Sequence, residues 1–175
     1  MQFCDLAHLR EVGGEAELAR LRACGFLTAE DAALVRLDEI ERFRRSPLLA
    51  ELLGRGRLFR ELRFNVRLPA AAFTADPTRR AAYAAETLLV QGVMDGIFEH
   101  EDGALHLFDY KTDRLSAAER RDPARAATRL LARHRTQLIY YAAACRRMYG
   151  TPPREVLIYS LPLGDTVAVP LPEEE

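Results

Sequence analysis

Two apolar segments joined by a short turn sequence constrain the fold of this chain more than any other feature. The segments TLLVQGVMDGIFEH (87–100) and ALHLFDYKTD (104–113) have the composition of β-strands, and Glu-Asp-Gly separates them. They predict an antiparallel hairpin, in which the numbers of directly opposite residues have a constant sum. A three-residue loop centred on Asp102 makes that sum 204 and places Asp95 opposite Asp109.

The length of this loop decides whether the two aspartates form a site. Side chains alternate across a strand, so Asp109, Lys111 and Asp113 are expected on one face. A three-residue loop, which we expect, adds Asp95 to that face, whereas a two-residue turn would pair Asp95 with Tyr110 and remove it. A cation would offset the repulsion between two adjacent carboxylates. Oxygen ligands without a nearby Cys or His favour Mg²⁺ or Mn²⁺.

Lys111 stands out because it is the one lysine among 25 basic residues. Arginine presents a planar fork that is always charged, whereas a lysine ammonium is compact and can contact a water or a phosphate oxygen. A chain that otherwise uses arginine therefore indicates a chemical role for Lys111. The alternative is an exposed lysine without a function.

The order of the remaining segments predicts a mixed α/β domain with helices packed on a central sheet. In chain order we expect helices within residues 1–55, a strand at 58–68, a loop at 69–84, the hairpin, a helix from Asp122-Pro123 to Gly150, and strands at 154–161 and 166–171. We expect one domain overall. Its parts would be a helical N-terminal region (1–55), a core (56–172) and a frayed acidic tail (173–175).

Composition excludes several other classes of protein. The net charge is −1, so any surface that binds nucleic acid must be local. No basic and apolar leader and no apolar run of about 18 residues is present, so we expect a cytoplasmic protein without a membrane span. Cys4, Cys24 and Cys145 contain no CxxC pair, so we expect no disulfide framework, no zinc site and no iron–sulfur cluster. No phosphate-loop motif occurs.

Four motifs resemble the PD-(D/E)XK nucleases. The resemblance is closer to the nuclease domain at the C-terminus of the AddA subunit of bacterial helicase–nucleases, relatives of RecB. In chain order the motifs are REL-RF (60–64), VQGVMDGIF (90–98), FDYKTD (108–113) and QLIYY (137–141). The D-x-K pattern alone is weakly specific, but four motifs in this order are strongly specific. The resemblance covers most of the chain from about residue 37.

The resemblance implies a restriction-endonuclease-like core, in which a mixed central β-sheet is flanked by helices. It implies Asp95 and Asp109 as ligands of Mg²⁺ (or Mn²⁺), together with the main-chain carbonyl of Tyr110. Lys111 would hold or activate the attacking water. Glu61 would assist at the metal or at a second ion.

The long helix supplies candidate contacts to DNA. Side chains that recur every four residues form one ridge along it: Arg125, Arg129, Arg133, Gln137 and Tyr141. Arginines on such a ridge can neutralise phosphates. The resemblance implies that Gln137 and Tyr141 fix the lysine region and contact a DNA phosphate. The alternative is a solvated, charged helix face.

The function that the resemblance implies is metal-dependent exonucleolytic cleavage of DNA, of single strands, within a bacterial helicase–nuclease of double-strand break repair and recombination. The expected partners are DNA, an AddB-like partner protein and the helicase portion of the full-length subunit. Two alternatives remain open. One is a non-catalytic domain that binds DNA or docks a partner, and the other is an unrelated Mg²⁺-dependent phosphoesterase.

The start of the chain departs from the family pattern. In the family, a His within an upstream GTxxH segment also binds the metal, whereas this chain opens at MQFCDLAH. We therefore expect that the chain begins just after that His and that its metal affinity is reduced. His8 falls after the segment and is not expected to replace it.

Overall fold

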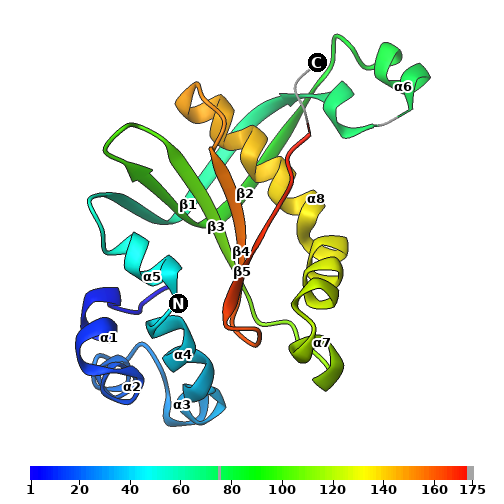
Figure 1. Ribbon diagram of the computed structural model, residues 1–175. Helices are drawn as coiled ribbons and strands as arrows, with labels where there is room; N and C mark the ends of the chain where they lie inside the picture. The colour runs from blue at the N-terminus through cyan, green and yellow to red at the C-terminus, as the bar shows by residue number, and fades with distance from the viewer. Residues whose placement is uncertain (75, 173–175) are drawn as a thin grey trace.

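A five-stranded mixed sheet forms the centre of the computed structural model, which describes residues 1–74 and 76–172 (Figure 1). The strands lie side by side in chain order: β1 (Gly56–Pro69), β2 (Thr87–His100), β3 (Leu105–Lys111), β4 (Glu155–Ser160) and β5 (Asp165–Ala168). β3 and β4 are parallel, and the other neighbouring pairs are antiparallel. The expected mixed sheet flanked by helices is confirmed, and it is consistent with a restriction-endonuclease-like core. The acidic tail at 173–175 lies outside the described residues.

Helix α8 (Pro123–Tyr149) covers one face of the sheet and connects β3 to its parallel neighbour β4. The helix begins as the sequence predicts, because the Asp122 side chain accepts a hydrogen bond from the amide of Arg125 and proline occupies the first turn. It ends at Gly150, whose φ of 81° is left-handed. Beneath the helix lies an apolar core that includes Met94, Ile97, Leu107, Leu130, Leu138 and Ile158.

Five short helices lie on the opposite side of the sheet (Figure 1, blue to cyan). They are α1 (Leu6–Val12), α2 (Gly14–Ala23), α3 (Ala29–Leu34), α4 (Leu37–Arg44) and α5 (Pro47–Leu52). The second core joins α1, α4 and α5 to the sheet, and its members include Leu9, Phe43, Leu49, Phe98, Phe108 and Tyr159. The strands at the centre of the sheet are thus buried on both faces.

Two expectations about the elements were wrong, and one helix was missed. Residues 69–84 are not a loop, because they contain the 3₁₀-helix η1 (Ala70–Phe73) and helix α6 (Pro77–Ala82). Asp76 caps α6 ahead of its proline, as Asp122 caps α8. Helix α7 (Ala117–Arg121), which begins with a capping box at Ser116, was not expected. β3 ends at Lys111, so Asp113 lies beyond the strand.

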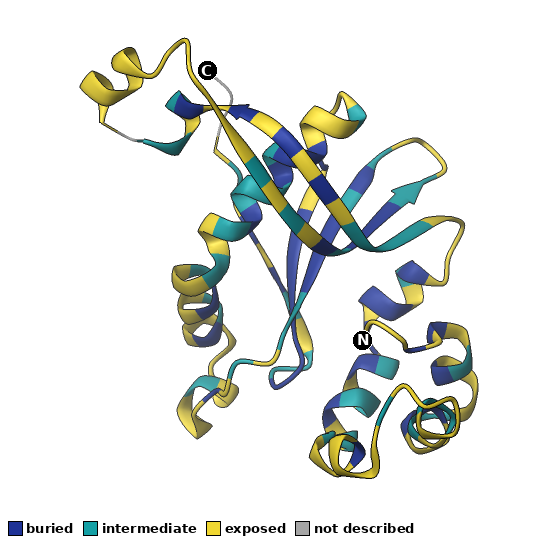
Figure 2. Ribbon diagram, turned by 180° about the vertical axis from the view of Figure 1, so that it is seen from behind, coloured by how far each residue is buried: buried dark blue, intermediate teal, exposed yellow. Residues whose placement is uncertain are grey.

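Burial is uneven along the hairpin strands. Figure 2 shows buried residues concentrated where the central strands meet both helix layers, whereas the end of β2 near η1 and α6 is exposed. The described helices include no segment with the length and apolar character required to cross a lipid bilayer.

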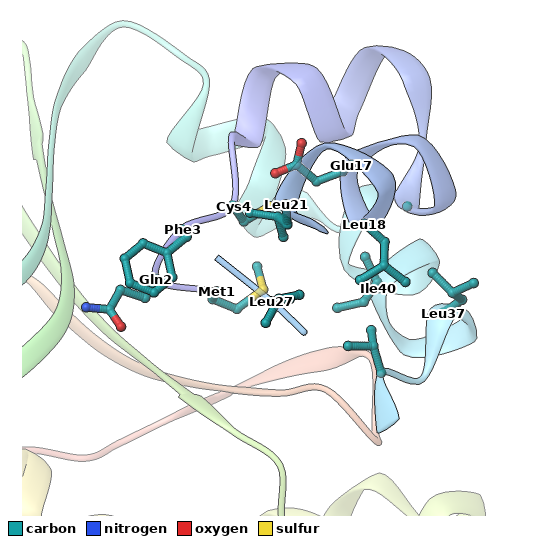
Figure 3. A pocket seen from close by; sticks show the side chains of 12 residues that line it. Met1, Gln2, Phe3, Cys4, Glu17, Leu18, Leu21, Leu27, Leu37 and Ile40 are labelled. Atoms are coloured by element: carbon teal, nitrogen blue, oxygen red, sulfur yellow. The ribbon is translucent and has the colours of Figure 1, made fainter. Parts of the chain in front are cut away.

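A cavity of about 300 Å³ lies among the N-terminal helices (Figure 3). Apolar side chains line most of it, including Leu18, Leu21, Leu27 and Ile40. The carboxylate of Glu17 points away from the cavity and is bound by Arg20 at 2.7 Å. Glu17 is the one charged side chain among the described lining residues, and none of the candidate site residues lines the cavity.

Candidate active site

Three neighbouring strands bring three acidic residues into one row. Gly96 pairs with Phe108, so the residue numbers across β2 and β3 have the expected sum of 204, and the three-residue loop is confirmed. Continued by one residue beyond this pair, which is the last of the β2–β3 ladder, the register places Asp95 opposite Asp109. Across β1 and β2, the pairs that flank Glu61 place it opposite Asp95. The row therefore runs Glu61, Asp95, Asp109.

The alternation of side chains changes phase at this row. On one side of it, Phe59 and Ile97 pack into the core under α8, and on the other side Leu62 and Met94 do so. Glu61 contributes to this change, because its φ is 51°, the one positive φ of a non-glycine residue in the described ranges. A left-handed backbone costs such a residue about 1–2 kcal/mol. Strain of this kind is concentrated at functional sites.

Replacing Glu61 with glycine should relieve the strain. We expect Glu61→Gly to raise the free energy of unfolding by up to about 1 kcal/mol, measured by urea denaturation, because glycine adopts a positive φ without a clash. Glu61→Ala retains the Cβ atom and should show no such gain. An equal gain in both variants would instead attribute the effect to removal of the carboxylate.

Asp109 and Lys111 form a buried ion pair on β3. The Oδ2 atom of Asp109 lies 2.5 Å from the Lys111 ammonium, and Asp109 is only 3% exposed. Burial raises the pKa of the Asp109 carboxyl; the hydrogen bond from Lys111 opposes this rise, and the charge of Asp95 adds to it. Asp95 is itself fixed, since its Oδ2 accepts a hydrogen bond of 2.8 Å from the amide of Tyr110.

A hydrogen bond to helix α8 also fixes the ammonium of Lys111. The Nζ of Lys111 donates to the amide oxygen of Gln137 at 3.1 Å, and the Nε2 of Gln137 donates to the hydroxyl of Tyr141 at 2.8 Å. The ring of Tyr141 packs edge-on against Phe64, with 5.4 Å between ring centroids. Gln137 and Tyr141 are four residues apart and share one helix face, so a single hydrogen-bonded chain links the helix to β3.

The donor atoms of this site suit a hard cation. Asp95 and Asp109 offer carboxylate oxygens, which Mg²⁺ and Mn²⁺ prefer, and the residues of the row offer no sulfur or nitrogen ligand. The three acids are not drawn together around one point. Among the described residues, the one group of three side chains whose ligand atoms all lie within 4.8 Å of one another is Glu51, His100 and His106. That group could hold a divalent metal ion.

Two of the three arginines of the helix ridge, Arg129 and Arg133, are paired with carboxylates. Arg129 donates twice to Glu119 of α7, at 2.9 and 2.8 Å, and Arg133 lies 2.8 Å from Asp113. The hydrogen bond from Arg129 is the main reason why the pKa of Glu119 is lowered to about 2. A DNA phosphate would have to compete with these partners, which the sequence alone did not indicate.

His134 is a residue near the site that the sequence did not reveal. Its Nε2 lies 2.8 Å from Asp113, two residues beyond Lys111. Burial of Asp113 tends to raise its pKa, but the hydrogen bond and charge of His134 and the charge of Arg133 outweigh this and lower it. The pairing ties the segment after β3 to helix α8. The only sequence signal for it was the position of His134 one turn before Gln137 on the predicted helix.

Comparison with known proteins finds relatives along most of the chain, although no protein-family model matches it. The relatives are named as the A subunits of ATP-dependent helicase/nucleases. The chain is 35% identical to that of Acetivibrio thermocellus over 145 residues, to that of Bacillus velezensis over 153 and to that of Moorella thermoacetica over 168. These matches cover 83%, 86% and 94% of the chain, but only 11% or 12% of each relative. The chain therefore corresponds to a small part of much longer proteins.

Proposed function

We propose that this chain, which belongs to the family of ATP-dependent helicase/nuclease A subunits, is a metal-dependent deoxyribonuclease that hydrolyses phosphodiester bonds of DNA. The observation that carries the proposal is the arrangement on β2 and β3. Asp95 and Asp109 lie directly beyond the last pair of the β2–β3 ladder, Gly96 and Phe108, and Lys111 pairs with Asp109 at 2.5 Å while α8 holds its ammonium. A solvated surface lysine would not need these partners.

Asp95, Asp109 and the main-chain carbonyl of Tyr110 would hold the ion, which we propose to be Mg²⁺ or Mn²⁺. Such an ion lowers the pKa of a bound water and neutralises charge that develops at phosphorus. Asp95 is oriented for this role by the Tyr110 amide. Glu61, on the outer strand of the row, would contribute through a water or a second ion, because it is not gathered with the other two carboxylates.

Lys111 would place a compact positive charge beside the attacking water or a phosphate oxygen. Its ammonium has three donors, and Asp109 and Gln137 use two of them. The third donor remains for a water or a phosphate. The role of Gln137 is then to position the ammonium, and Tyr141 positions Gln137.

Loss of Gln137 should slow cleavage without preventing it. We expect Gln137→Ala to reduce the cleavage rate at saturating Mg²⁺ by about tenfold, or about 1.4 kcal/mol, because the ammonium loses one anchor but keeps Asp109. Gln91→Ala, at an exposed position of β2, is a matched control that should cleave normally. An unchanged rate in Gln137→Ala would show that the helix does not position Lys111 for catalysis.

The proposed substrate is single-stranded DNA, cleaved from an end, as the family resemblance implies. Gln137 and Tyr141 would meet the phosphates nearest to the site. Arg129 and Arg133 would contribute where DNA displaces Glu119 and Asp113 from them. The helicase portion of a longer protein would deliver the strand, and an AddB-like partner would complete the assembly, in double-strand break repair in the cytoplasm.

A cleavage assay tests the proposal directly. The chain is incubated with end-labelled single-stranded DNA, linear double-stranded DNA and a small phosphodiester, each with Mg²⁺, with Mn²⁺ and with excess chelator. We expect metal-dependent loss of label from single-stranded DNA. Preferential turnover of the small ester would support an unrelated phosphoesterase instead.

Calorimetric titration with Mn²⁺ separates catalysis from docking. Wild-type chain should bind one more Mn²⁺ than Asp95→Asn does, whether or not Glu51, His100 and His106 also bind the ion. If the chain cleaves no DNA and its Mn²⁺ binding is the same with and without the Asp95 carboxylate, the nuclease assignment is wrong and a non-catalytic domain is left.

A further inference from the structure

A second group of metal-binding side chains lies on the other face of the sheet. His100 and His106 lie on β2 and β3, each two residues from a phenylalanine, Phe98 or Phe108, that packs against the N-terminal helices. Side chains alternate across a strand, so both histidines face those helices, away from Asp109. The carboxylate of Glu51, in the last turn of α5, lies within hydrogen-bond distance of both histidines.

The three ligand atoms converge on one point. The Oε1 of Glu51 lies 2.6 Å from the Nδ1 of His106 and 3.2 Å from the Nε2 of His100. The two ring nitrogens lie 3.2 Å apart. In a tetrahedral zinc site with bonds of about 2.0–2.1 Å, ligand atoms lie about 3.3 Å apart. Two sides of the observed triangle match this separation, and the contact between Glu51 and His106 would have to widen by about 0.7 Å to accept an ion.

The chemistry of the triangle selects a class of metal. Two imidazole nitrogens and one carboxylate oxygen suit Zn²⁺ and similar transition-metal ions, whereas Mg²⁺ prefers oxygen ligands alone. The positions are partly shielded, because the side chains of Glu51 and His100 are each 27% exposed and that of His106 is 12% exposed. Glu155 is a candidate fourth ligand, since its Oε2 lies 4.0 Å from the Nδ1 of His106; a water is the other.

We propose that Glu51, His100 and His106 form a Zn²⁺-class metal site that fastens helix α5 to the β2–β3 hairpin. The site is independent of the proposed nuclease site and does not rest on it. Its ligands come from segments about 50 residues apart, so a bound ion would cross-link the N-terminal helices to the sheet and stabilise the folded chain.

One feature limits the affinity of the site. Ligation through Nδ1 leaves the N–H of His106 on Nε2, which is buried and has no hydrogen-bond partner among the described residues. Metal-binding histidines usually donate that N–H to a partner, and loss of the partner weakens binding by about 10- to 100-fold. We therefore expect an affinity well below that of a fully supported structural zinc site.

Zinc titration of the metal-stripped chain tests the proposal. The chain is treated with a chelator, dialysed and titrated with zinc chloride in competition with a chromophoric chelator, and its melting temperature is followed in parallel. We expect one Zn²⁺ per chain, a higher melting temperature with Zn²⁺ and no competition from equimolar Mg²⁺. His100→Gln and Glu51→Gln, which are mild changes at partly exposed positions, should each weaken binding by at least about tenfold.

Matched variants identify the source of any binding. His8→Gln and His134→Gln remove histidines outside the triangle, and Cys24→Ser removes the exposed thiol, so all three should bind Zn²⁺ as wild type does. Asp109→Asn should also retain zinc affinity, which separates this site from the nuclease proposal. The proposal fails if zinc does not bind, or if His100→Gln and Glu51→Gln both bind it with wild-type affinity; three hydrogen-bonded side chains would then explain the contacts.

Discussion

Asp109→Asn will reduce Mg²⁺-dependent cleavage of single-stranded DNA by at least about 100-fold, or about 2.7 kcal/mol of transition-state stabilisation. Asparagine keeps the size of this buried side chain but removes the charge that would bind the ion and that pairs with Lys111. Lys111→Ala should cause a loss of similar size, because nothing else in the site replaces its ammonium. The measurement is the initial cleavage rate at saturating Mg²⁺, with circular dichroism to confirm folding.

Asp102→Asn is the matched control for Asp109→Asn. It makes the same chemical change on the same hairpin, at an exposed position where asparagine can still accept the hydrogen bond from Ala104. Wild-type activity is expected. Lys111→Arg tests whether a positive charge at this position is enough for cleavage. We expect this variant not to cleave, since a guanidinium fork does not fit the space of an ammonium held by Asp109 and Gln137. Normal cleavage by Asp109→Asn or Lys111→Ala would remove the site from consideration.

Gly96→Ala will cause the largest loss of stability expected from a single methyl group in this chain. A Cβ atom at Gly96 would lie 2.0 Å from the ring of Phe108, the residue that pairs with it across the hairpin. Phe108 is 1% exposed and packed against the N-terminal helices, so its ring has no free space to enter. Overpacking of this kind costs about 1–3 kcal/mol and occasionally more; we expect at least about 3 kcal/mol in urea denaturation.

Gly103→Ala separates this clash from the loss of glycine itself. Gly103 lies on the loop of the same hairpin, has a φ of 81° and has no atom within 4 Å of an added Cβ. Its replacement should cost only about 1 kcal/mol, from backbone strain. The double variant Gly96→Ala/Phe108→Leu should lose less free energy of unfolding than the two single variants lose together, because leucine leaves room for the added methyl group. Additive effects would contradict the steric explanation.

The hairpin and the long helix were predictable because their signals are local. The Glu-Asp-Gly turn and the Asp122-Pro123 start each act within a few residues, and the observed register and the bounds of α8 follow them. The same local signal at Asp76-Pro77 also begins a helix, of six residues, but the segment that contains it was expected to be a loop. The roles of Asp95, Asp109 and Lys111 remain predictions that the observed register permits.

The parts that the sequence could not predict depend on contacts between distant segments. Asp113 and His134 are 21 residues apart, and Glu51 and His106 are 55 apart. No periodicity relates such positions, and only the folded sheet brings them together. The arginine ridge shows the same limit, because spacing predicted a shared face for Arg129 and Arg133 but not the acids that bind them. The change of phase at Glu61 likewise has no signal in an alternating strand pattern.

The packing of helices on both faces of β3 also determines which parts of the sheet open first. Leu107 is packed under α8 and Phe108 under the N-terminal helices, so the amide protons around them should exchange with deuterium only when the whole chain unfolds. Residues 87–91 of β2 are mostly exposed and should exchange through local opening. The strand that carries Asp109 and Lys111 would thus stay folded while the start of β2 opens locally. Mass-spectrometric exchange should rank the two segments in that order.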